Sequence, residues 1–130
     1  DVRAALPRVV LWGSGSPRRE FLHVDDMAAA CVFVMQLDDE RYAAACAAGT
    51  VSHLNVGCGR DHTIRELSRM IAKAVGFAGE VVWDAGKPDG MPQKLLYVSR
   101  LTALGWRQLI GLEIGIGQAY EWYQSRSLRS

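Results

Sequence analysis

The side chains best suited to hold an anionic ligand flank one glycine-rich turn near the start of the chain. Trp12 precedes the run Gly13-Ser14-Gly15-Ser16-Pro17, and Arg19 follows it two residues later. A guanidinium stays charged and can make two parallel hydrogen bonds to a diphosphate. An indole can lie along a nucleotide base. These residue types therefore predict that the turn places both groups over one small anionic ligand.

Plainer roles for the same residues stay open at this point. Arg19 can form a surface ion pair with Glu20 or Asp25, and exposed pairs of this kind contribute little to stability. Trp12 can pack in the core instead of meeting a ligand. Nothing further in the sequence favours a ligand for Arg18, so we expect this neighbouring side chain to be solvated.

Two more candidates lie on one segment in the second half of the chain. Asp89 stands in Lys87-Pro88-Asp89-Gly90, whose proline and glycine are typical of a turn, where an aspartate commonly bonds its own backbone. A carboxylate can also accept two donors side by side, from a ribose diol or from the edge of guanine. Lys94 follows on the same segment and can meet a phosphate as a point charge.

Composition and charge favour a globular protein with one domain over residues 1–130. The chain has 49% hydrophobic and 22% charged residues, and its net charge of +1 indicates neither nucleic acid nor a membrane surface as a partner. The longest uncharged apolar run, 27–37, is too short to span a bilayer. Cys31, Cys46 and Cys58 show neither disulfide nor zinc spacing, and no metal site is predicted, so we expect a reducing, cytoplasmic setting.

The expected elements alternate between short strands and helices. Apolar runs predict a buried helix over 27–37 and a helical tail with a loop over 38–50, and Asp25-Asp26 suits a helix start. Thr63 and Glu66 have the spacing of a capping box that begins a helix ending at Gly76. Ser99 is expected to cap a short helix. Further strands are predicted at 9–12, 21–24, 53–56, 80–83 and 95–98, and helices at 99–104 and 112–123.

Several motifs resemble the GDP-L-fucose synthases, which are extended short-chain dehydrogenase/reductases of the NAD-dependent epimerase/dehydratase family. The similarity covers the stretch WGSGSPRREFLHVDDMA from Trp12, then HLNVGCG, TIRELSRMIAKAVG, KPDGMPQKLL and the final YEWY. It implies an α/β fold, with short strands and about four helices, that forms the C-terminal substrate-binding part of such an enzyme. Most of the Rossmann sheet would then lie in a missing N-terminal part, and the chain would be a fragment of a longer enzyme.

The resemblance also implies a function and a set of site residues. The full enzyme would epimerise and reduce GDP-4-keto-6-deoxy-D-mannose to GDP-L-fucose with NADPH, as a homodimer. Arg19 would hold the diphosphate of the GDP-sugar, Trp12 and Asp89 would contact the nucleotide, and Lys94 would meet a phosphate. The cofactor NADP would be bound by the missing N-terminal Rossmann domain.

Two motifs of the family are absent from the printed sequence. Gly57-Cys58-Gly59 lacks the third glycine of a dinucleotide turn, because His62 stands there, so it is better read as a tight connection. No tyrosine is followed four residues later by the lysine that would lower its pKa for proton transfer. We therefore expect no catalytic or cofactor-binding residue here, and a chain that alone neither binds NADPH tightly nor turns over substrate.

Alternatives stay open because the sequence departs from the family pattern at two positions. Gln93 and Tyr97 stand where the family usually has arginine and aspartate. The loss of arginine removes a positive charge near the expected phosphate, which leaves room for another nucleotide-sugar epimerase or dehydratase. A non-catalytic module that self-associates through unpaired strands is the alternative from a different class.

Overall fold

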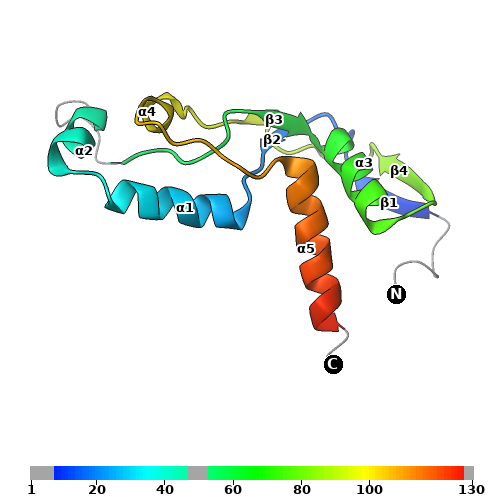
Figure 1. Ribbon diagram of the computed structural model, residues 1–130. Helices are drawn as coiled ribbons and strands as arrows, with labels where there is room; N and C mark the ends of the chain where they lie inside the picture. The colour runs from blue at the N-terminus through cyan, green and yellow to red at the C-terminus, as the bar shows by residue number, and fades with distance from the viewer. Residues whose placement is uncertain (1–7, 47–52, 128–130) are drawn as a thin grey trace. The chain divides into compact units, whose positions relative to one another are not determined.

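The computed structural model describes residues 8–46 and 53–127, which form a mixed α/β chain (Figure 1). The described residues divide into two compact units. Unit 1 comprises residues 8–19, 61–94 and 112–127. Unit 2 comprises residues 20–46, 53–60 and 95–111. The α/β class is as predicted, with five helices among the described residues in place of about four, because residues 39–45 form a helix of their own.

Unit 1 is built on a pair of parallel strands. β1 (Arg8–Trp12) lies beside β4 (Glu80–Asp84), with Val10 opposite Val82 in the register. The strands predicted at 9–12 and 80–83 are confirmed. Both contain adjacent valines, and β-branched residues suit such a pleated surface. Two helices of the same unit, α3 (Ile64–Val75) and α5 (Leu112–Ser127), pack against each other.

The start and end of α3 follow directly from its sequence. The Thr63 hydroxyl accepts a hydrogen bond from the Glu66 amide, and the Glu66 carboxylate accepts one from the Thr63 amide at 2.7 Å. These bonds satisfy amides that have no partner inside the helix. Gly76 ends the helix in the left-handed conformation with φ 66°. The capping box and the glycine stop are both confirmed.

A three-stranded sheet has the order β3-β2-β5. These strands are β3 (Asp61–Thr63), β2 (Arg18–Glu20) and β5 (Gln93–Lys94), and β2 runs parallel to β5. The strands predicted at 21–24, 53–56 and 95–98 are wrong. Residues 21–23, 53–56 and 95–98 are loops, and Val24 already belongs to a helix.

The physical reason lies in the core of unit 2. Ala30, Leu101 and Trp106 are buried there, and loop residues Leu22, Leu54 and Val56 pack against them. The apolar runs at 21–24 and 53–56 therefore contribute to the core from loops, without a strand partner, whereas Leu95, Leu96 and Tyr97 are exposed. The helices of this unit are α1 (Val24–Met35), α2 (Asp39–Ala45) and α4 (Ser99–Ala103) (Figure 1).

Two details of these helices differ from the sequence-based predictions. The N-cap of α1 is His23, whose Nδ1 accepts a hydrogen bond from the Asp25 amide, so the helix begins before the aspartates. The N-cap of α4 is Val98 and it makes no side-chain bond, so the predicted cap by Ser99 is wrong.

The prediction that α1 is buried on most sides is also wrong for the residues described. Asp26 and Ala30 are its buried positions, at 3% and 0% exposure. Val24 and Met35 on its other side are 71% and 85% exposed. A helix that is apolar on most sides is normally buried on most sides. Here the apolar face that carries Val24 and Met35 is not covered by any described residue.

No helix within the described ranges is both long and apolar enough to cross a membrane.

Candidate functional site

The glycine turn after β1 is held by the Asp89 carboxylate. Asp89 Oδ1 accepts a hydrogen bond from the Ser14 amide at 2.8 Å, and Oδ2 accepts one from the Ser14 hydroxyl at 2.6 Å. These two bonds to the charged form hold the pKa of the Asp89 carboxyl below its usual value. Asp89 therefore ties its own segment to the turn 75 residues earlier in the chain, where the sequence suggested a bond to its own backbone.

The same segment reaches the other two predicted ligand residues. Lys87 places its ammonium 5.4 Å from the centre of the Trp12 ring. A side chain at Gly90 would begin 3.2 Å from Nη2 of Arg19, so the backbone passes close to that guanidinium. Residues 87–90 thus touch Trp12, the turn and Arg19 in one unit. The structure brings Trp12, Arg19 and Asp89 together around this segment.

The strand pair β2 and β5 separates its polar side chains onto two faces. Arg18 lies opposite Gln93 in the register, and Arg19 lies opposite Lys94. Neighbouring residues along a strand point to opposite faces, so Arg19 and Lys94 share the face that Arg18 and Gln93 do not use. Two cations on one face form a site suited to an anion such as a diphosphate.

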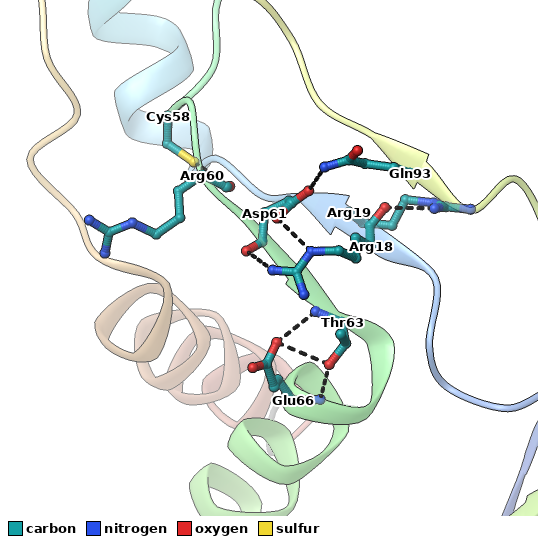
Figure 2. Close-up of polar contacts among 8 residues, drawn as sticks. All are labelled: Arg18, Arg19, Cys58, Arg60, Asp61, Thr63, Glu66 and Gln93. Atoms are coloured by element: carbon teal, nitrogen blue, oxygen red, sulfur yellow. Dashed lines mark hydrogen bonds and ion pairs between the residues drawn. The ribbon is translucent and has the colours of Figure 1, made fainter.

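On the opposite face, Arg18 and Gln93 both bond the Asp61 carboxylate (Figure 2). Arg18 Nε lies 2.8 Å from Asp61 Oδ1, and the Gln93 amide donates to Asp61 Oδ2. The bond from Gln93 and then that from Arg18 hold the pKa of the Asp61 carboxyl below its usual value. The Arg18 side chain, which we expected to be solvated, is 43% exposed but is also ion-paired with Asp61. Position 93 faces this carboxylate, so the residue that departs from the family pattern is already engaged by Asp61.

The plainer roles considered for Arg19 and Trp12 do not match the coordinates. Glu20 accepts bonds from the Gly59 and Leu96 amides, at 2.6 and 3.0 Å. Within the described part of the chain, the Arg19 guanidinium has no carboxylate partner and donates to the Arg18 carbonyl. Trp12 is 74% exposed, so its ring is available to a ligand. Ligand contact by Trp12, Arg19, Asp89 and Lys94 stays a prediction.

Three residues next to the site were not predicted from the sequence. Ser14 carries the contact to Asp89. Arg65 donates to the Ser14 carbonyl, and its Cζ lies 4.7 Å from the centre of the Trp83 ring. The sequence offers only a weak signal for them, because an arginine in a first helical turn and a tryptophan at a strand end have many uses.

The Gly57-Cys58-Gly59 run is a connection, as predicted. A side chain at Gly57 would begin 2.5 Å from the Glu20 carboxylate, and Gly59 has a φ of 69°. Both glycines are therefore required by local geometry. Burial raises the pKa of the Cys58 thiol, which donates to the Arg60 carbonyl at 3.1 Å.

Comparison with known proteins supports the resemblance. Residues 2–57 match the model of the NAD dependent epimerase/dehydratase family. GDP-L-fucose synthase of Escherichia coli (strain K12) is 56% identical over 117 residues, which is 90% of this chain. The predicted resemblance to GDP-L-fucose synthases is confirmed. The chain spans about a third of the length of this relative, 36%.

Solved structures agree with this resemblance. A GDP-6-OMe-4-keto-L-xylo-heptose reductase from C. jejuni has a TM-score of 0.82 and 36% identity, covering 92% of this chain and 34% of its own. A GDP-mannoheptose C4 reductase from Campylobacter jejuni, with NADP bound, has a TM-score of 0.77 and 36% identity, covering 90% of this chain and 35% of its own. The fold is thus shared with extended short-chain dehydrogenase/reductases whose names specify GDP-sugars.

Proposed function

We propose that this chain is the GDP-sugar-binding part of a GDP-L-fucose synthase-like enzyme. The enzyme would epimerise GDP-4-keto-6-deoxy-D-mannose at two carbons and reduce it to GDP-L-fucose with NADPH. The observation that carries the proposal is that segment 87–90, which includes Asp89, lies next to both Trp12 and Arg19 within unit 1. Each of the three has a side chain that suits a different part of a nucleoside diphosphate.

The proposed roles follow from the chemistry of each group. Arg19 and Lys94, on one face of the β2–β5 pair, neutralise the diphosphate. The exposed indole of Trp12 lies along the nucleotide. Asp89 keeps further lone pairs beside those used by Ser14, because a carboxylate has about four acceptor sites. It can therefore also accept a ribose diol or the guanine edge.

The cofactor and the catalytic groups are assigned to the rest of the enzyme. The printed sequence contains neither the glycine turn for a pyrophosphate nor the tyrosine–lysine pair. We therefore propose that NADP binds an N-terminal Rossmann domain, that the enzyme is a cytoplasmic homodimer, and that this chain alone is inactive. Titration of the isolated chain with NADPH, followed by fluorescence, should show no micromolar binding.

Isothermal titration of the full-length protein with GDP, UDP and dTDP tests the proposed substrate class. GDP should bind more tightly than the other two nucleotides. Arg19→Met should weaken GDP binding at least tenfold, because a charged hydrogen bond contributes about 1.5–3 kcal/mol. Arg69→Met, which removes an exposed arginine from α3, is the matched control and should leave the affinity unchanged.

Preferential binding of UDP or dTDP would favour another nucleotide-sugar epimerase or dehydratase. Absence of all nucleotide binding, combined with a stable dimer in light scattering, would favour the non-catalytic module.

A further inference from the structure

The glycine turn 13–16 is held in place far more firmly than an exposed loop requires. Gly13 and Gly15 are buried, and their φ angles are +81° and +74°. The Gly13 amide donates to the Asp84 carbonyl at 2.9 Å, which ties the turn to the end of β4. A loop normally lies open to solvent and is more mobile than the elements it connects. This turn is built to keep one shape.

One side of the turn is fixed by a carboxylate. Asp89 accepts both the amide and the hydroxyl hydrogen of Ser14. A side chain at Gly13 would overlap Oδ1 of Asp89, so glycine is needed for this close approach. The Ser14 peptide is therefore fixed through its N–H group.

The other side is fixed by a stacked cation. The Arg65 guanidinium donates to the Ser14 carbonyl, and the Arg65 amide donates to the Gly15 carbonyl at 2.9 Å. The guanidinium stacks on the Trp83 ring, with 4.7 Å between Cζ and the ring centre. A side chain at Gly15 would begin 2.6 Å from that same ring. Arg65, Trp83 and the turn thus form one layered contact within unit 1.

We propose that Arg65 is a positioning residue for nucleotide binding, acting with Trp83 to fix the turn that lies between Trp12 at the end of β1 and Arg19 in β2. The proposal rests on the proposed function, because it takes Trp12 as a ligand contact. Arg65 holds the carbonyl side of the turn while Asp89 holds the amide side, so the backbone that directly follows Trp12 keeps one conformation. Pre-organisation of this kind raises affinity by reducing the entropy lost on binding.

The consequence is a coupling between two residues. Without the Arg65 side chain, the Ser14 carbonyl loses its charged partner, while the Gly15 carbonyl keeps its bond from the backbone amide of residue 65. The backbone that follows Trp12 is then less fixed, so we expect the indole to contribute less to binding, and removal of Trp12 to cost less affinity than it does in the wild-type protein. Independent roles would instead give additive effects, as is usual for separate sites.

A double-mutant cycle on the full-length protein tests this coupling. GDP dissociation constants are measured for the wild type, Arg65→Met, Trp12→Phe and the double variant, with Arg69→Met as control. Arg65→Met should weaken GDP binding about tenfold, because the lost hydrogen bond is charged. The double variant should bind no more weakly than the worse single variant, and Arg65→Lys should recover part of the affinity.

Two outcomes would overturn the proposal. Either Arg65→Met binds GDP as the control does, or the losses of Arg65→Met and Trp12→Phe multiply in the double variant. If Arg65→Met fails to fold, the same cycle with Arg65→Lys decides between these results. Arg19→Met separates this failure from that of the proposed function: it still weakens GDP binding if only the positioning role is wrong.

Discussion

The two units use their buried groups in different ways. In unit 2 the hydrophobic side chains Ala30, Leu101 and Trp106 form a core, and Leu101 is 1% exposed. In unit 1 the two glycines of the turn, Gly13 and Gly15, are buried while Trp12 remains 74% exposed. Within residues 8–46 and 53–127, the buried hydrophobic residues Ala30, Cys46, Leu101 and Trp106 lie in unit 2, whereas Pro17 is a buried apolar residue of unit 1. The difference suggests a scaffold in one unit and a recognition surface in the other.

The carboxylates of the two units show the same contrast. Asp26 is 3% exposed and accepts bonds from the Leu109 and Ile110 amides, at 3.0 and 2.9 Å. Asp89 lies at the surface and fixes a turn beside two predicted ligand residues. A buried carboxylate bound to backbone amides secures a loop, whereas an exposed one can also meet a ligand. Substitutions in the two units should therefore change different properties.

The largest stability effect is expected from Leu101→Ala in the core of unit 2. Truncation of a fully buried leucine leaves a cavity and costs about 3 kcal/mol of the free energy of unfolding. The urea-denaturation midpoint of the full-length protein should fall accordingly. Leu109→Ala, at a position that is 88% exposed, is the matched control and should have little effect. Equal midpoints for the two variants would remove the distinction between scaffold and surface.

A smaller loss is expected from Asp26→Asn. An asparagine has one acceptor oxygen, so its NH₂ group would face an amide donor, and the unsatisfied pair costs about 2 kcal/mol. The same urea experiment measures this loss. Asp25→Asn next to it, at an exposed position, serves as the control. If both variants denature alike, Asp26 does not secure the 109–110 loop.

The smallest effect concerns the pH dependence of the glycine turn. The lowered pKa of Asp89 means that its bonds to Ser14 stabilise the fold above the unfolded value, about 3.9, and are lost as pH falls through the folded value. Thermal midpoints measured between about pH 5 and 2 should therefore fall less steeply for Asp89→Asn than for the wild type. Parallel curves would show that these bonds contribute no pH-dependent stability.

The elements with strong local signals were predictable from the sequence. The capping box of Thr63 and Glu66 and the glycine stop at Gly76 define α3 through contacts within a few residues. β1 and β4 are β-branched runs, and both were found. Residue chemistry and the family resemblance single out Trp12, Arg19 and Asp89 from the sequence, whereas their proximity is a property of the fold.

What could not be predicted depends on contacts between distant segments. The runs at 21–24 and 53–56 look like strands because they are apolar, yet residues such as Leu22 and Leu54 serve the core from loops. Arg18 and Arg19 are adjacent and identical in type, so only the pairing of β2 with β5 separates their roles. Arg65 and Trp83 gain their role from contacts with a turn much earlier in the chain. Arg65 bonds Ser14, which lies 51 positions before it.

A crystal structure of the full-length protein with GDP bound tests the central claim most directly. The account predicts the diphosphate within hydrogen-bond distance of the Arg19 guanidinium, on the face of β2 and β5 that also carries Lys94, with the nucleotide along Trp12. A diphosphate bound instead at the Arg18–Asp61 face, or away from unit 1 altogether, would contradict it.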